Sequence, residues 1–170
     1  MMVADTDLLA ARVWEKGRYY EDFTVGDVYD HHWGRTLNAG DNSSFCTATA
    51  AWLPLYLNAA YARSLGHPDL VVHPMLVFCT VLGLTVEDLS EGGGGGAFLR
   101  VTELHSRSPV YPGMTLTARS EVLEQRPSRS RPDQAILTWR TTGFADDGVV
   151  VVDFRRTNLV RRRQDERSDR

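Results

Sequence analysis

The chain has 170 residues, of which 42% are hydrophobic and 24% charged, and this composition is typical of one globular domain. Its formal net charge of −3 gives no electrostatic reason to expect binding to nucleic acid or to an anionic membrane. No apolar run approaches the roughly 20 residues that span a bilayer, and no signal peptide is recognisable, so we expect a soluble, cytoplasmic protein.

The N-terminal part of the chain shows two different patterns. Residues 1–16 have apolar side chains at helical spacing and are expected to form either a short docking helix or a loosely ordered arm. Between Arg18 and His32, aromatic side chains surround the turn dipeptide Gly26-Asp27, a pattern that favours extended structure.

Two short helices are predicted next. The segment 38–44 is rich in residue types that cap helices, so a small helix is expected over 45–52, bounded by Pro54. Asn58 is expected to cap a second helix over residues 59–65.

The segment from Pro74 to Val86 is apolar around nearly its whole circumference and predicts a helix that is buried on all sides. Pro74 suits the first turn, where its missing N–H would have no partner within the helix in any case. The two cysteines, Cys46 and Cys79, lie in apolar runs. We therefore expect two reduced thiols in the core and no zinc site built from cysteines.

Beyond the five glycines at 92–96, the period of the sequence changes from that of a helix to that of strands. Turn sequences such as Asp147-Gly148 separate the predicted strands, which cover residues 98–105, 114–125, 135–144 and 149–160. Successive strands joined by short turns favour an antiparallel sheet. The final segment, 161–170, is charged and has no apolar residues, so it is expected to be disordered.

One long buried helix followed by an antiparallel meander is an α+β arrangement in which the sheet wraps the helix. Three segments make this arrangement specific, namely residues 17–27, 72–76 and 109–116. In these segments the chain resembles the MaoC-like dehydratases, the family of the (R)-specific enoyl-CoA hydratases, and the likeness extends over residues 17–160. The resemblance implies a single hot-dog fold, with a long buried central helix wrapped by an antiparallel sheet.

The resemblance also implies a function. Members of this family add water to enoyl thioesters of coenzyme A or an acyl carrier protein, or remove it from 3-hydroxyacyl thioesters, and use no metal or redox cofactor. An Asp and a His in a motif like Asp-x-Asn-Pro-x-His hold the water and move its proton. A backbone N–H at the start of the central helix polarises the thioester carbonyl.

This chain departs from that motif. Pro54 fixes the register, in which Ala51 replaces the family's Asp, Leu53 its Asn and Tyr56 its His. General acid–base catalysis is worth roughly 10²–10⁴-fold, so the loss of both groups should nearly abolish simple hydration.

The residues that remain near the expected site supply the candidates. We predict Tyr56 and His73 as catalytic residues, Tyr56 donating a proton or a hydrogen bond and His73 transferring a proton. In the alternative, Tyr56 fills the vacated space and His73 orients the turn. Pro74 has no N–H to offer the thioester, and the amide of Met75 is its expected substitute. The predicted substrate contacts are Trp52, Met75 and Phe78.

Other polar residues are weaker candidates. Asp41 and Asn42 are residue types that occur in catalytic sites, but helix capping is the better interpretation of their position. Arg107 could contact a phosphate of a pantetheine carrier, although a solvated surface position is also expected in an arginine-rich chain. The pair His31-His32 has no third ligand at suitable spacing and is a weak metal signal.

Three functions are compatible with these features. The first is a hydratase- or dehydratase-type enzyme that acts on an acyl thioester or a polyketide-like substrate by a divergent mechanism. This first function also includes a reassigned isomerase or cyclase of secondary metabolism. The second is a conventional hydratase whose acid and base come from other segments. The third is a non-catalytic subunit that completes the pocket of an active paralogue. Hot-dog proteins typically pair through sheet edges, so a homodimer or a heterodimer with another hot-dog subunit is expected.

Overall fold

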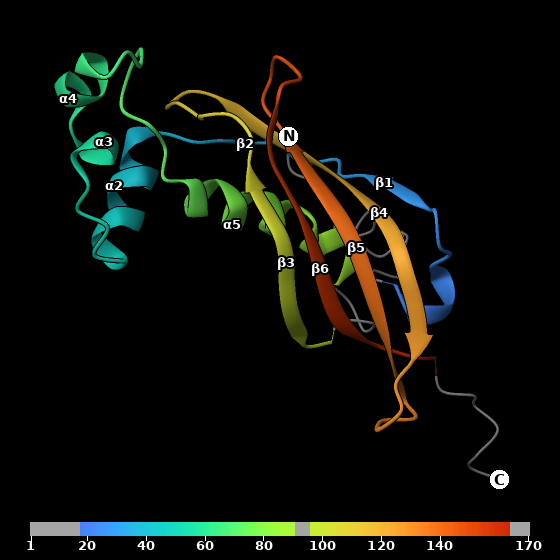
Figure 1. Ribbon diagram of the computed structural model, residues 1–170. Coiled ribbons are helices and arrows are strands. Elements are labelled where there is room, and N and C mark those ends of the chain that lie inside the picture. Colours follow the sequence, from blue (N-terminus) through green and yellow to red (C-terminus); the bar gives the residue numbers. More distant parts are fainter. Residues whose placement is uncertain (1–17, 91–95, 164–170) are drawn as a thin grey trace, which may run out of the picture.

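The computed structural model describes residues 18–90 and 96–163 (Figure 1), so the arm expected over residues 1–16 lies outside it. The helices are η1 (Tyr20–Asp22), α2 (Ala39–Ala48), α3 (Pro54–Leu57), α4 (Ala59–Ser64), α5 (Pro74–Leu84) and α6 (Val86–Leu89). The strands are β1 (Val28–Asp30), β2 (Arg35–Thr36), β3 (Phe98–Ser106), β4 (Thr115–Pro127), β5 (Gln134–Phe144) and β6 (Val150–Arg161).

The strands form an antiparallel sheet in the order β1-β4-β5-β6-β3, and β2 also pairs with β4. The four long strands follow the predicted ranges to within two residues, so the predicted change of period after the glycines is confirmed. From Leu116 to Val122, buried and exposed side chains alternate along β4, which places one face of the sheet on the core. Gly148, with φ of 80°, lies in the predicted turn between β5 and β6.

Figure 1 shows α5 crossing one face of this sheet. The helix buries Val77, Phe78 and Val81 in a cluster with side chains of β4 and β6. The ring of Phe78 meets that of Phe154 edge-on, with 4.8 Å between the ring centroids. This cluster is the main core and fixes the position of α5 on the sheet.

Gly143 of β5 allows the close approach of α5 to the sheet. A Cβ atom added there would lie 2.5 Å from Cγ2 of Val81 and 2.9 Å from Cγ1 of Val152. Neither distance is compatible with van der Waals contact, so a larger residue would push helix and strand apart.

Two helix predictions need correction. The helix expected over 45–52 is α2, which starts earlier because Asn38 caps it, its side chain accepting from the N–H of Asp41. The central helix expected to run on through Val86 is interrupted at Thr85. The buried hydroxyl of Thr85 donates to the carbonyl of Leu82 at 2.7 Å, and the chain restarts as α6.

The expectation that the central helix is buried on all sides is wrong for the described chain. Met75 and Cys79 are exposed, as is Gly83, and the three lie at i, i+4 and i+8 on one side of α5. Cys46 is buried as predicted, whereas Cys79 is not a core thiol. The sheet covers only one side of the helix, and the apolar stripe on the other side is left open.

The charged end of the chain is ordered further than expected. Strand β6 includes Arg161, and the guanidinium of Arg163 donates to both carboxylate oxygens of Asp22 at 2.7 and 2.9 Å. Arg162 pairs with Glu21 at 3.3 Å. These contacts tie the end of β6 to η1, while the rest of the predicted tail lies outside the described residues.

Gly143 in β5 and Gly83 in α5 give a first test. We expect Gly143→Ala to lower the free energy of unfolding by about 1–3 kcal/mol, because its methyl group would overlap Val81 and Val152. Gly83→Ala adds the same methyl group where no atom lies within 4 Å, and should raise stability by up to about 1 kcal/mol through helix propensity. Urea unfolding of both variants measures the difference, and equal stabilities would contradict the packing described here.

Candidate functional site

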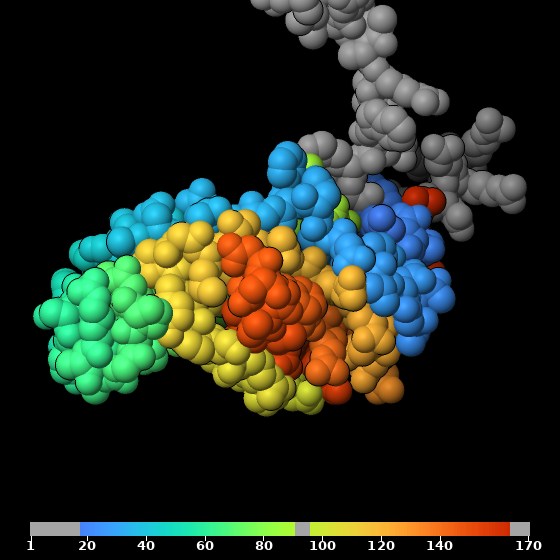
Figure 2. Space-filling model, turned by 90° about the horizontal axis from the view of Figure 1, so that it is seen from above, coloured from blue at the N-terminus to red at the C-terminus, as the bar shows by residue number. Residues whose placement is uncertain are grey.

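Helices α2, α3 and α4 form a lobe (the α2–α4 lobe) that packs mainly on itself and projects from the sheet beside the start of α5 (Figures 1 and 2). At the start of α2, Asn38 and Asp41 form a reciprocal capping box, so the predicted capping role of Asp41 is confirmed. Asn58 caps α4 as predicted, accepting from the N–H of Tyr61 at 3.1 Å.

Asn42 is not a capping residue. Its side chain holds the α2–α4 lobe to the segment that leads into α5. Its fully buried side chain donates to the carbonyls of Tyr56 at 2.8 Å and Val71 at 3.2 Å, and accepts from the N–H of His73 at 2.8 Å. One amide group thereby joins α2, α3 and the segment that leads into α5. It fixes the backbone of both predicted catalytic residues.

The turn between α2 and α3 contains Ala51, the position at which the resemblance leads one to expect an Asp. Ala50 has a φ of 55°, a left-handed conformation that costs a non-glycine residue energy. The next residue, Ala51, is held by a hydrogen bond from its N–H to the carbonyl of Cys46 at 2.9 Å. The turn is therefore strained and well fixed, although Ala51 carries no functional group.

Tyr56 and His73, the two residues predicted to be catalytic, lie side by side. Their ring centroids are 4.6 Å apart, and the ring of Phe45 lies 5.2 Å from His73 on α2. Both predicted catalytic side chains are partly exposed. We refer to these three rings as the aromatic corner.

His73 is the N-cap of α5. Its Nδ1 accepts a hydrogen bond from the N–H of Met75 at 3.1 Å, which fixes the neutral tautomer with the proton on Nε2. Burial lowers the pKa of His73, which also favours the neutral ring. His73 can therefore offer an N–H to a ligand.

The first turn of α5 has no N–H left for a thioester carbonyl. Pro74 lacks one, Met75 donates to the side chain of His73, and the amides of Leu76 and Val77 both donate to the carbonyl of His73. The predicted role of the Met75 amide therefore has no support in this geometry.

The three predicted substrate contacts lie in different surroundings. Trp52 is 63% exposed in the α2–α4 lobe, and Met75 is 41% exposed on the open side of α5. Phe78, in contrast, is buried in the core against Phe154. The structure leaves the first two accessible to a ligand and gives Phe78 a packing role.

Arg107 is paired within the chain. Its Nε donates to Asp153, to which His105 and Arg140 also lie close, at 3.4 and 3.8 Å. The hydrogen bond from Arg107 lowers the pKa of Asp153, which therefore stays ionised. The contact with an internal carboxylate favours the surface interpretation of Arg107.

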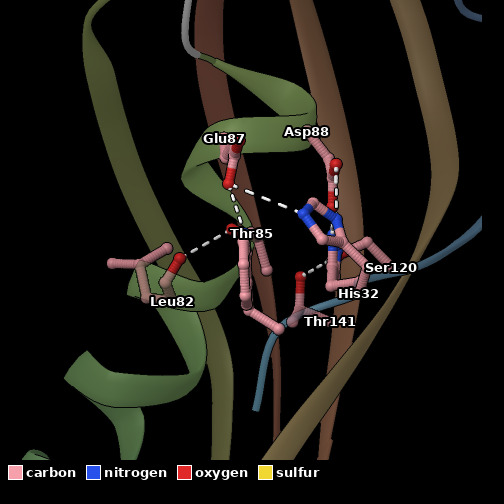
Figure 3. A network of polar contacts seen from close by, with 9 residues as sticks. His32, Leu82, Thr85, Glu87, Asp88, Ser120 and Thr141 are labelled. Atoms are coloured by element: carbon pink, nitrogen blue, oxygen red, sulfur yellow. Dashed lines mark hydrogen bonds and ion pairs between the residues drawn. The ribbon is translucent and has the colours of Figure 1, made fainter. Parts of the chain in front are cut away.

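A second polar cluster was not foreseen from the sequence. The buried ring of His31 lies 2.7 Å from the Asp88 carboxylate and 2.9 Å from the Ser120 hydroxyl. The Ser120 hydroxyl in turn contacts that of Thr141 at 2.8 Å (Figure 3). The order carboxylate, imidazole, hydroxyl is that of a nucleophilic triad. Ser120 is fully buried, however, so the cluster stabilises the fold between α6 and the sheet.

Within residues 18–90 and 96–163, no group of three or more His, Cys, Asp or Glu side chains is arranged to hold a metal ion. In the same part of the chain, no helix is both long enough and apolar enough to cross a membrane.

Comparison with known proteins connects this geometry with a family. The sequence model described as Mesaconyl-CoA hydratase matches residues 4–170. The chain belongs to the mesaconyl-CoA hydratase family. A mesaconyl-CoA hydratase from Haloarcula hispanica is 36% identical over 97% of this chain, a match that covers 46% of the relative. The chain thus spans about half the length of the curated relatives it matches.

Solved structures confirm the predicted hot-dog fold. A MaoC-like dehydratase from Rhodospirillum rubrum is 27% identical, has a TM-score of 0.77, and is matched over 87% of this chain and 99% of that one. A Mycobacterium tuberculosis protein described as a double hot-dog has a TM-score of 0.76 at 24% identity, and the match covers 88% of this chain and 46% of its own. Within the mesaconyl-CoA hydratase family, this chain therefore has the size of one hot-dog unit.

Replacing Asn42 tests whether its hydrogen bonds hold the α2–α4 lobe in place. We expect Asn42→Ala to lower the free energy of unfolding by about 2–4 kcal/mol, because three backbone groups lose their partner in a buried place. Ser43→Ala, at the exposed neighbouring position, should change it by about 0.5 kcal/mol or less. Thermal unfolding compares the two, and a similar small effect of both would show that Asn42 does not hold the lobe.

His31 makes stability depend on pH. Burial lowers its pKa, opposed by Asp88 and assisted by Arg156, so the unfolded chain takes up the proton more readily than the folded one. Stability is thus complete above the unfolded histidine pKa of about 6.5 and is lost as pH falls below it. Urea unfolding at several pH values should show this loss, and His31→Gln should reduce it. An unchanged slope in the variant would refute the assignment.

Proposed function

We propose that this chain is the thioester-binding unit of a hydratase or dehydratase that acts on coenzyme A thioesters. The observation that supports this most directly is the aromatic corner, where Tyr56 and His73 are in contact and Asn42 holds both backbones. Among the described residues, neither the Tyr56 hydroxyl nor Nε2 of His73 has a hydrogen-bond partner. Two unengaged donors beside the start of α5 suit a ligand oxygen.

The chemistry of the family explains what such donors do. When water adds to an enoyl thioester, its oxygen bonds to C3, and negative charge develops on the thioester oxygen until C2 takes a proton. Fixed donors aimed at that oxygen stabilise the charge. Dehydration runs through the same charged state in reverse. We assign the hydrogen bonds to the thioester oxygen to the Tyr56 hydroxyl and to Nε2–H of His73.

The proposed role of His73 differs from general-base catalysis. Its Nδ1 lone pair is already used by the N–H of Met75, and Nε2 carries the proton. Accepting a second proton would break the cap of α5. The geometry therefore favours a hydrogen-bond donor over the proton-transfer group predicted from the sequence.

The proposed substrate is an enoyl or 3-hydroxyacyl thioester, with coenzyme A as carrier. Support comes from the Haloarcula relative, which is named for a coenzyme A thioester, and from the family match along almost the whole chain. Trp52 and Leu53 are exposed in the lobe that carries Tyr56, and they provide apolar surface for such a ligand.

Titration of the purified chain with crotonyl-CoA tests the proposal. We expect saturable binding in calorimetry, weakened about 2- to 10-fold in Tyr56→Phe and in His73→Asn. The first removes the hydroxyl donor and the second removes the donor at the Nε2 position, each worth about 0.5–1.5 kcal/mol. Asn at position 73 keeps an acceptor for the N–H of Met75, so the cap of α5 survives.

The matched control is Tyr61→Phe on α4, an exposed tyrosine that should leave affinity unchanged. Free coenzyme A, which lacks the acyl carbonyl, should bind wild type and His73→Asn equally. Absence of saturable binding, or equal affinity of all variants for crotonyl-CoA, would refute the proposed function.

A further inference from the structure

We infer that the buried guanidinium of Arg156 in β6 binds the carboxylate of a small organic acid. This site does not depend on the function proposed above, because it lies apart from the aromatic corner. The aromatic corner surrounds the start of α5, whereas Leu89, which packs near the site, follows the end of that helix. The 11 residues of α5 span about 16 Å between the two places.

Buried polar atoms without a hydrogen-bond partner gather at one place on the sheet. In the part of the chain that the structure describes, these atoms are Nε and Nη2 of Arg156, Nε1 of Trp139, Oδ1 of Asn158 and Oε1 of Gln125. Trp139 lies directly opposite Arg156, and in the next row Leu137 lies between Gln125 and Asn158. Residues that lie opposite each other share a face, and Leu137 and Trp139 both face the core. Such atoms normally find a partner, so their concentration on one inner patch indicates a place for a ligand.

Arg156 brings a full charge to this patch. The residue is 2% exposed, and its guanidinium carbon lies 5.1 Å from the centroid of the Trp139 ring. Among residues 18–90 and 96–163, it makes no ion pair with any carboxylate. Burial lowers the pKa of Arg156 to about 10, so the guanidinium is still charged at neutral pH. A buried charge without a counter-ion is costly, and a bound anion would recover part of that cost.

A β-bulge turns an acidic side chain of the chain itself away from the patch. Up to Val122, alternate residues of β4 face inward, and in an unbroken strand Glu124 would be the next to do so. The register shifts between Val122 and Glu124. As a result Gln125 faces inward, while Glu124 lies outward, opposite Thr138. The inner face that carries Arg156 thereby receives a neutral amide where it would otherwise receive a carboxylate.

The groups on this patch fit a planar anion with a single charge. One guanidinium is neutralised by a monoanion, whereas sulfate or another dianion would leave a negative charge buried. The two unpartnered nitrogens, Nε and Nη2, form one edge of the guanidinium and match the two oxygens of a carboxylate. The indole N–H of Trp139 is a further donor, and the amides of Asn158 and Gln125 can donate or accept. Formate and acetate are the simplest ligands of this kind.

The cover beside the patch is a short element. Leu89 of α6 is buried in the same cluster as Trp139. Helix α6 has four residues, and its Asp88 is joined to His31 at 2.7 Å. So short a helix can open locally at a lower free energy than the whole fold. A small acid can therefore reach Arg156 when α6 opens.

Thermal unfolding in sodium formate tests the site. Formate replaces chloride at constant ionic strength and at pH 8, where His31 is neutral because burial lowers its pKa. We expect Tm to rise saturably, by about 5–10 °C when formate exceeds its dissociation constant 100-fold. Sulfate at the same ionic strength should give no saturable rise.

Two variants locate the effect at Arg156. Arg156→Met keeps the length of the side chain and removes its charge, so it should lose the formate response without lowering Tm in chloride. Asn158→Asp places a carboxylate two residues along the same face and should also abolish the response. The matched control is Arg155→Met on the outer face, where the arginine pairs with Glu103 at 2.9 Å, and it should keep the full response.

Nuclear magnetic resonance gives a readout at the site itself. The indole N–H signal of Trp139, identified by its loss in Trp139→Phe, should shift with the same dependence on formate as Tm. No rise above chloride would mean that water satisfies these atoms and would overturn the inference. An equal rise in wild type and Arg156→Met, or a Trp139 signal that does not move, would contradict it as well. These measurements involve no thioester, so their failure leaves the proposed function standing.

Discussion

The side chain of Asn42 is the contact on which the geometry of the site depends. A buried amide of this kind is stable only when its donors and acceptor are all satisfied, and here three backbone groups from two other segments satisfy it. The same bonds orient Tyr56 and His73 before any ligand arrives. A lobe that packs little on the sheet is thereby held in a defined position relative to α5.

The backbone around the Asn42 side chain is fixed at three further points. The turn at Ala50 has a left-handed backbone, His73 caps the start of α5, and Gly143 lets the central helix pack closely on the sheet. Left-handed backbone at a non-glycine residue persists only where the surroundings impose it. The backbone that carries Tyr56 and His73 is therefore held in place, as the proposed hydrogen bonds to a thioester oxygen require.

The sequence was informative where periodicity or local chemistry determines structure. The long strands were predictable from the period of the sequence, and the capping roles of Asp41 and Asn58 from residue type. Interactions between distant segments were not. His31 meets partners 57 and 89 positions away, and Asn42 binds carbonyls that only the folded lobe brings near it. Hydropathy gave the same signal for both sides of α5, because it cannot tell which partner covers each side.

The two cysteines allow the covered and the uncovered surfaces of the helices to be compared within one chain. Cys46 is completely buried in α2, while Cys79 is exposed on the stripe of α5 that the sheet leaves uncovered. Burial raises the pKa of the Cys46 thiol and makes it the less reactive of the two. The natural chain therefore carries one accessible thiol, Cys79, on the exposed stripe of α5. The buried thiol of Cys46 serves as an internal control for its reactivity. Alkylation of Cys79 reports directly whether α5 is covered, without any engineered label.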